Sequence, residues 1–91
     1  MYSNIFSTKG FIEKYKKVNV RIRRVVDKQL EQFEKDPLEK NLNNHKLREK
    51  WQGYRSIDIN NDYRAIFREV DEGEEHNVYF VDLGTHEELY G

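Results

Sequence analysis

The second half of the chain, residues 54–91, limits the fold more than any other stretch. Two runs rich in β-branched and aromatic residues, Tyr54–Ile59 and Tyr63–Val70, are separated by a short turn of asparagine and aspartate. Such runs, joined by residues that tolerate positive φ, predict a β-hairpin. A third run, Val78–Leu83, follows a polar, glycine-containing connection at Asp71–Asn77. The stretch is therefore predicted to be an antiparallel meander closed by a short tail.

The register of the first predicted hairpin decides which side chains share a face. A three-residue turn at Asn60–Asp62 places on one face the apolar set Ile57, Ile59, Tyr63, Ala65 and Phe67. The other face then receives mostly polar side chains, with Asp58 directly opposite Arg64. A two-residue turn would instead bring Arg64 beside Ile57 and mix charge into the apolar face. We therefore predict the three-residue turn.

The first half of the chain is predicted to back this sheet. Tyr2–Phe6 is consistent with an edge strand, and Ser7 and Thr8 are candidate N-caps for a helix over residues 9–17. Asn19 can cap a longer second helix, which ends before the single proline because that position disfavours the α conformation. The predicted order is β-α-α-β-β-β. This is an α+β fold with the N-terminal strand and two helices packed on one face of an antiparallel sheet.

Length and composition predict one domain over residues 1–91, with an irregular approach at Leu38–Gly53 between the second helix and the meander. The chain has no cysteine, no recognisable signal peptide and no apolar run near the ~18 residues that cross a bilayer. A soluble, cytoplasmic protein without membrane contact is therefore expected. Neither a glycine-rich phosphate loop nor a metal-ligand spacing such as H-x-x-x-H occurs, so no metal or cofactor is expected.

The net charge of −1 conceals a strong asymmetry along the chain. Residues 9–24 carry seven Lys or Arg and one Glu, and residues 45–68 carry six Lys or Arg against three acids. Residues 69–91 hold eight acids and no Lys or Arg. Basic patches suit a phosphate-bearing partner, although solvated helix and strand faces show the same pattern. Charge alone therefore leaves the partner open.

Four short motifs follow one another in the second half: His45-Lys-Leu, Trp51-Gln-Gly-Tyr-Arg, Asn61-Asp-Tyr-Arg and Gly84-Thr-His-Glu-Glu-Leu-Tyr-Gly. In this order and at these separations they resemble the RelE superfamily of bacterial toxins, most closely its YafQ branch. The first half is similar only in its strand-helix-helix layout. The resemblance implies a RelE-like fold and a messenger-RNA endoribonuclease that typically acts on the ribosome. It also implies a cognate antitoxin that blocks the toxin, with operator DNA bound only through the antitoxin complex.

The resemblance further implies which residues carry the reaction. His45, Asp62 and His86 match the YafQ-like catalytic set, and Tyr90 matches its terminal aromatic residue. Arg64 lies where RelE-type members place an arginine that serves the scissile phosphate. These five residues are therefore the expected centre of the site.

Metal-independent RNA cleavage by the 2′-OH needs a base, an acid and cations that stabilise the phosphorane. Histidine suits both proton transfers because it titrates near neutral pH. We expect His86 to act as general acid and His45 or Asp62 as base. Arg64 would stabilise charge on the phosphate, and Tyr90 would stack on a base or bond the phosphate. Four further basic side chains are expected to bind RNA: Lys46, Arg48, Lys50 and Arg55.

One position departs from the family pattern, because Asp58 stands where YafQ-like proteins usually have a histidine. Asp58 is a candidate catalytic residue or, alternatively, an ion-pair partner that holds Arg64. Two other functions stay open. One is a ParE-type toxin that binds a protein target such as gyrase, and the other is an inactive member kept for antitoxin binding. ParE-type relatives lack the terminal histidine–tyrosine pair, so residues 84–91 argue against the first.

Overall fold

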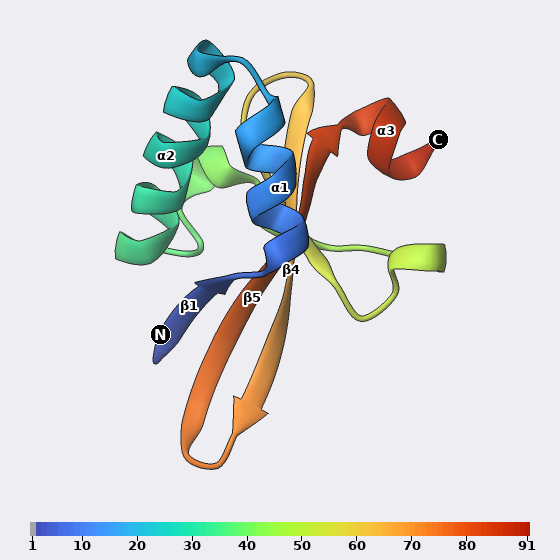
Figure 1. Cartoon of the computed structure of the whole chain (residues 1–91). Coiled ribbons are helices and arrows are strands. Elements are labelled where there is room, and N and C mark those ends of the chain that lie inside the picture. Colours follow the sequence, from blue (N-terminus) through green and yellow to red (C-terminus); the bar gives the residue numbers. More distant parts are fainter. Residues whose placement is uncertain (1) are drawn as a thin grey trace.

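Five strands and three α-helices make up the fold in this computed structural model, which describes residues 2–91. The elements are β1 Asn4–Ser7, α1 Lys9–Lys17, α2 Val20–Lys35, β2 His45–Lys46, β3 Arg55–Asp58, β4 Tyr63–Glu72, β5 Glu75–Thr85 and α3 His86–Tyr90. The strands form one sheet in the order β1-β5-β4-β3-β2, and α1 and α2 lie together on one side of it (Figure 1). The predicted α+β fold is confirmed.

The two long helices begin and end where the sequence predicts. The hydroxyl of Thr8 accepts a hydrogen bond from the backbone N–H of Phe11 at 3.3 Å, so Thr8 rather than Ser7 caps α1. The side-chain oxygen of Asn19 accepts the N–H of Ile22 at 3.0 Å and caps α2 in the same way. Each cap satisfies a backbone donor that the first helical turn leaves without a partner.

The predicted register of the first hairpin is also confirmed. Ile57 pairs with Ala65 and Asp58 pairs with Arg64 across β3 and β4. The N–H of Ile59 donates to the carbonyl of Tyr63 at 2.9 Å, which leaves residues 60–62 as the turn. Asp58 and Arg64 therefore lie side by side on the face that points away from α1 and α2.

β1 differs from the prediction in both its position and its direction. It begins at Asn4 and pairs in parallel with β5, so the sheet is mixed rather than antiparallel. Tyr2 lies just before the strand, where its hydroxyl donates to Glu69 at 2.6 Å and its ring stacks on Phe33. The partner strand comes more than 70 residues later, so the local pattern of residues 2–6 carries no information on the direction of pairing.

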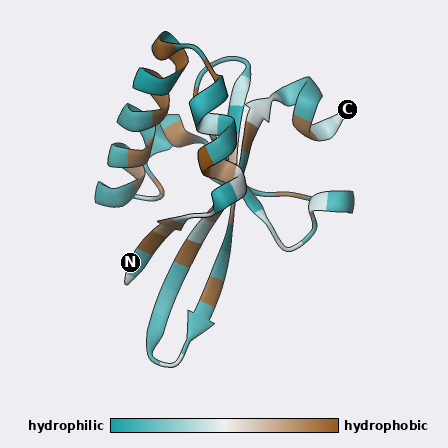
Figure 2. Cartoon of the chain, viewed as in Figure 1, coloured by the Kyte–Doolittle hydropathy of each residue, from teal (hydrophilic) through white to brown (hydrophobic). Residues whose placement is uncertain are grey.

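The connection predicted at residues 71–77 is instead mostly strand. β4 and β5 continue to a two-residue turn, Gly73-Glu74, in which the glycine has a φ of 66°. Polar cross-strand pairs extend the ladder, since Asp71 pairs with His76 and Glu72 with Glu75. The tip of this hairpin projects past the helices and is hydrophilic (Figure 2). The prediction of a loop was therefore wrong, because the polar composition of this segment belongs to solvent-exposed strands.

The segment predicted as irregular, residues 38–53, contains a strand and two 3₁₀ turns. The short strand β2 pairs antiparallel with β3, with His45 opposite Ser56 and Lys46 opposite Arg55. Two residues are too few to produce a visible alternation, so the sequence could not reveal this strand. β2 adds a fifth strand to the sheet and places His45 at its edge.

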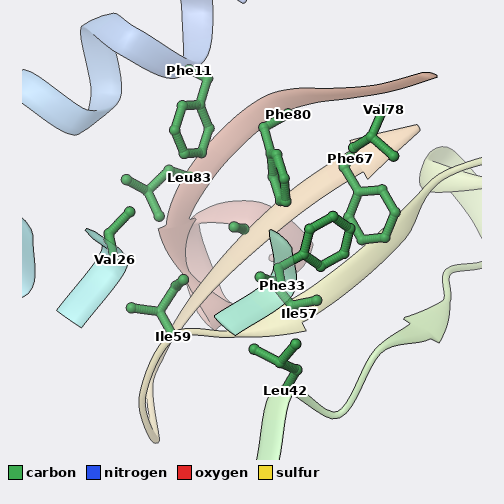
Figure 3. Packing of buried hydrophobic residues seen from close by; sticks show 11 residues of the cluster. Phe11, Val26, Phe33, Leu42, Ile57, Ile59, Phe67, Val78, Phe80 and Leu83 are labelled. Carbon is green, nitrogen blue, oxygen red and sulfur yellow. The ribbon is translucent and has the colours of Figure 1, made fainter. Parts of the chain in front are cut away.

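The core lies between the two long helices and one face of the sheet (Figure 3). Its buried members are Phe11, Val26, Phe33, Leu42, Ile57, Ile59, Ala65, Phe67, Val78, Phe80 and Leu83. The ring of Phe33 meets those of Phe67 and Phe80 edge-on, with centroids 5.0 and 5.2 Å apart. Aromatic quadrupoles favour this arrangement. The apolar face predicted for the hairpin is thus the face that α1 and α2 cover.

Candidate active site

The opposite face of the sheet is covered in part by α3. Ser56 and Ile66 alternate with the core residues of β3 and β4, so they point to the face away from α1 and α2. Both are nevertheless fully buried. The hydroxyl of Tyr90 donates to Ser56 Oγ at 3.2 Å, and the indole N–H of Trp51 donates to the carbonyl of Leu89 at 2.9 Å. These contacts hold the last helix of the chain against the sheet.

The start of α3 is defined by a capping box. Thr85 Oγ1 accepts the N–H of Glu88 at 3.1 Å, and the Glu88 carboxylate accepts the N–H of Thr85 at 2.7 Å. The backbone N–H of Thr85, and then its hydroxyl, lower the pKa of the Glu88 carboxyl. A Cβ atom at Gly84 would lie 3.2 Å from Glu88 Oε1 and 3.4 Å from Leu89 Cγ, so the absence of a side chain lets the strand and the helix approach closely. The sequence analysis predicted only a short tail here and missed α3, although Thr85-x-x-Glu88 is a capping-box signature that could have indicated it. The capping box makes His86 the first helical residue.

His86 and Tyr90 are one helical turn apart and in contact. Their ring centroids are 4.7 Å apart with an interplanar angle of 64°, an edge-on packing. The N–H of His86 donates to the carbonyl of Asp62 at 2.9 Å, which ties the turn of the first hairpin to the start of α3. The tail and the hairpin turn therefore form one structural unit.

Asp62 contributes to that unit through its backbone. Asn60, not Asp62, closes the turn, because Asn60 Oδ1 accepts the N–H groups of Asp62 and Tyr63 at 2.9 and 2.7 Å. The Asp62 side chain is exposed, and its carboxylate makes no hydrogen bond to residues 2–91. The hydrogen bonds that join Asp62 to this unit are therefore those of its backbone.

The guanidinium of Arg64 donates hydrogen bonds to backbone carbonyls in and beside the same turn. Its Nη1 atom donates to the carbonyls of Asn60 at 2.8 Å and Tyr63 at 3.0 Å, and its Nη2 atom lies 3.4 Å from the carbonyl of Asn61. Its Nε atom lies 3.0 Å from Asp58 Oδ1, and the Arg64 side chain is only 17% exposed. Asp58 Oδ1 is buried and accepts no hydrogen bond among residues 2–91, so its contact with Arg64 is an ion pair. The position that departs from the family pattern therefore holds Arg64 electrostatically.

His45 approaches from the edge of the sheet. It pairs with Ser56, so its side chain lies on the α3 side, and its Nδ1 atom is 2.7 Å from the carbonyl oxygen of Asn43. The imidazole is otherwise exposed.

These elements enclose a cleft of about 330 Å³. It is lined by Asn43, His45, Leu47, Arg64, His86 and Tyr90. The structure thus brings four of the six residues proposed for catalysis to one cleft, from β2, β4 and α3. Asp58 lies behind Arg64, and Asp62 lies on the adjoining turn. Within residues 2–91, no three His, Asp or Glu side chains converge as metal ligands do.

The basic residues expected to bind RNA divide between the two faces. Arg48 and Lys50 are exposed on the turn that follows β2 and the cleft residue Leu47. Lys46 and Arg55 are cross-strand partners, and both alternate away from the cleft face. Arg55 donates to Asn44 Oδ1 at 2.8 Å and lines a separate cleft on the other face. The structure therefore does not bring Lys46 or Arg55 to the side of the sheet that carries the histidines.

Comparison with known proteins places this geometry in context. A family model described as a bacterial toxin of type II toxin–antitoxin system, YafQ, matches residues 4–91. No curated protein sequence matches the chain.

No helix within residues 2–91 is both long and apolar enough to cross a membrane.

Several solved structures share the fold. YafQ from E. coli strain BL21(DE3) is 22% identical with a TM-score of 0.77, covering 96% of this chain and 97% of that one. The E. coli DinJ–YafQ complex matches at 23% identity and a TM-score of 0.66, covering 96% and 97%. The toxin–antitoxin complex RelBE2 from Mycobacterium tuberculosis matches at 20% identity and a TM-score of 0.69, covering 94% and 100%.

Proposed function

The chain belongs to the YafQ family of bacterial type II toxins, and from this membership we propose that it is a messenger-RNA endoribonuclease that acts at the ribosome. The observation that carries the proposal is the cleft in which His45, His86, Arg64 and Tyr90 meet. Acid–base cleavage of RNA requires a base, an acid and a cation near the phosphate, and the two imidazoles and the guanidinium of this cleft can supply them.

In the proposed reaction the 2′-OH of RNA attacks the adjacent phosphorus, and no metal ion takes part. A base removes the 2′-OH proton as the new P–O bond forms, and an acid protonates the 5′-oxygen as the old bond breaks. The products are a 2′,3′-cyclic phosphate and a free 5′-OH. We assign the acid to His86, which α3 presents at its first residue beside Tyr90.

We assign the base to His45 in preference to Asp62. His45 lines the cleft and is held by a hydrogen bond at Nδ1, which leaves Nε2 for the substrate. Asp62 is joined to His86 by its backbone but is not part of the cleft lining. Asp62 is the alternative base if the RNA reaches over the hairpin turn.

The remaining groups bind the substrate. Arg64 supplies a fixed positive charge in the cleft wall while its hydrogen bonds brace the turn. Tyr90 lines the cleft with an aromatic ring on which a splayed base can stack. Arg48 and Lys50, which are exposed next to the cleft, contact the RNA backbone.

A cognate antitoxin is the proposed protein partner. The solved relatives include the DinJ–YafQ and RelBE2 toxin–antitoxin complexes. In this chain α1 and α2 carry most of the basic segment 9–24, which suits an acidic, apolar peptide that folds as it binds. Contact with operator DNA would occur only through the antitoxin.

The experiment that tests the enzymatic proposal compares three proteins in a cell-free translation reaction, with messenger-RNA ends mapped by primer extension. Wild type is expected to cleave, and His86→Ala is expected to lose roughly 10²- to 10⁴-fold of the rate, the usual contribution of a positioned acid or base. His76→Ala is the matched control, because His76 lies on the β4–β5 hairpin and pairs with Asp71 outside the cleft.

The other outcomes identify the competing functions. Translation arrest with intact messenger RNA would contradict cleavage and indicate a protein target. A wild-type protein that neither cleaves nor arrests translation would contradict the ribonuclease proposal and agree with either a toxin whose target lies outside translation, such as gyrase, or a member that only binds an antitoxin.

A further inference from the structure

Asn43 lines the cleft beside His45, yet the reaction as assigned above gives it no part. It ends the 3₁₀ turn Lys40–Leu42 in the left-handed conformation, with φ 48° and ψ 49°. Apart from glycine, asparagine is one of the few residues whose backbone adopts this conformation readily. The position therefore has a backbone requirement that the residue type meets.

The segment around Asn43 is anchored on both sides. Leu42 is fully buried in the core. The side chain of Asn44 donates to the carbonyl of Pro37 at 2.9 Å and accepts from Arg55 Nε at 2.8 Å. The amide of Asn43 itself reaches Asp58 Oδ2 at 3.4 Å, a long contact that adds little. The direction of the Asn43 carbonyl is thus set mainly by its left-handed backbone between two fixed neighbours.

That carbonyl determines where the hydrogen of His45 resides. Its oxygen lies 2.7 Å from His45 Nδ1 and can only accept a hydrogen bond. Nδ1 must therefore carry the hydrogen. A neutral imidazole has one N–H, so the lone pair is then on Nε2, which makes no hydrogen bond within residues 2–91.

We propose that Asn43 is a positioning residue: its carbonyl, held in the left-handed conformation, keeps neutral His45 in the Nδ1–H tautomer so that Nε2 accepts the proton of the 2′-OH. The proposal rests on the proposed ribonuclease function for its consequence, but the tautomer itself is measured without any substrate. Without this contact the ring can rotate and place a hydrogen on the nitrogen that must act as base.

Two substitutions separate the backbone requirement from the asparagine side chain. Asn43→Gly retains the left-handed conformation at no steric cost but removes the contact with Asp58. Asn43→Val keeps a side chain of moderate size, but a β-branched residue disfavours a φ of 48° and would turn the carbonyl away. Asn41→Val is the matched control, because Asn41 is exposed and lies outside the cleft.

The test is a long-range ¹H–¹⁵N correlation spectrum of each ¹⁵N-labelled protein at about pH 8.5, where an ordinary histidine is neutral. For His45, wild type, Asn43→Gly and Asn41→Val are expected to show a protonated Nδ1 and an unprotonated Nε2. Asn43→Val is expected to shift the population toward Nε2–H. A wild-type His45 with hydrogen on Nε2 would overturn the proposal, and so would a folded Asn43→Val protein that keeps the Nδ1–H tautomer.

Cleavage in the translation assay provides the second readout. Asn43→Val is expected to lose less than the roughly 10²- to 10⁴-fold of a missing base, because the imidazole is still present. Asn43→Gly should cleave at a rate much closer to that of wild type than Asn43→Val does. If wild type has the Nδ1–H tautomer but cleaves no RNA, the positioning role stands and the ribonuclease function fails. If the Val protein does not fold, the wild-type and Gly spectra still decide the tautomer.

Discussion

Replacement of Arg64 by lysine tests whether this residue mainly holds the hairpin turn or mainly serves the phosphate. Arg64→Lys keeps the positive charge but loses the planar fork that reaches three turn carbonyls and Asp58 at once. An ammonium can retain the ion pair or one carbonyl, so at least one of the two short hydrogen bonds is lost. The Arg64 side chain is 17% exposed, so water replaces these bonds poorly.

The magnitude follows from these contacts. A hydrogen bond to a charged group contributes about 1.5–3 kcal/mol, and a partly exposed ion pair adds about 0–1 kcal/mol. We therefore expect Arg64→Lys to lower the free energy of unfolding by ~3 kcal/mol. For a domain of this size that corresponds to a fall in Tm of roughly 12–24 °C. Urea unfolding followed by circular dichroism measures the first quantity, and a thermal scan measures the second.

Arg68→Lys is the matched control for this experiment. Arg68 is on the same strand, β4, but it is exposed, and its guanidinium lies 5.5 Å from the centre of the Tyr79 ring. Such a contact is worth about 0.5–1 kcal/mol, and lysine keeps part of it. If Arg64→Lys is as stable as Arg68→Lys but no longer cleaves RNA, the bracing role is refuted and Arg64 acts on the phosphate.

Three further predictions concern α3 and its contacts. Tyr90→Phe leaves the buried Ser56 hydroxyl without its partner, and urea unfolding should show a loss of about 1–3 kcal/mol; an unchanged midpoint would mean that the hydrogen bond is not formed. Gly84→Ala places a Cβ atom 3.2 Å from Glu88 Oε1, so the flexible Glu88 side chain must shift; we expect a loss of stability below the about 1–3 kcal/mol of an overpacked core, together with shifted amide resonances of Thr85 and Glu88, and unmoved resonances would contradict the close packing. The pKa of Glu88 is lowered in the folded protein, so the ionised carboxylate stabilises the fold. This contribution to the free energy of unfolding is fully present above the ordinary pKa of 4.5 and is lost as the pH falls through the folded pKa. Wild type should therefore exceed Glu88→Gln in stability at pH 7 and approach it in acid, and a stability gap that is the same at both pH values would argue against the capping box.

Features that depend on residues close together in the chain could be predicted from the sequence alone. Thr8 and Asn19 cap their helices because a side-chain oxygen reaches an N–H three residues ahead. The hairpin register followed from a turn of three residues and the need to keep Arg64 out of the apolar face. The placement of His45, Arg64, His86 and Tyr90 in one cleft was anticipated only through the family motifs, since these residues are far apart in the chain.

Features that depend on residues far apart in the chain became visible only in the folded protein. The parallel pairing of β1 with β5, the existence of β2 and the side of the sheet that Lys46 and Arg55 occupy all depend on strand neighbours remote in sequence. For Asp58 and Arg64 the sequence predicted opposite positions on neighbouring strands, and the tertiary structure adds the 3.0 Å ion pair that the sequence had left as one of two alternatives. Caps and turns are decided by energies between residues a few positions apart, which a sequence displays directly. The direction of β1 and the pairing of strands that are remote in sequence are decided by contacts that exist only after the chain has closed on itself.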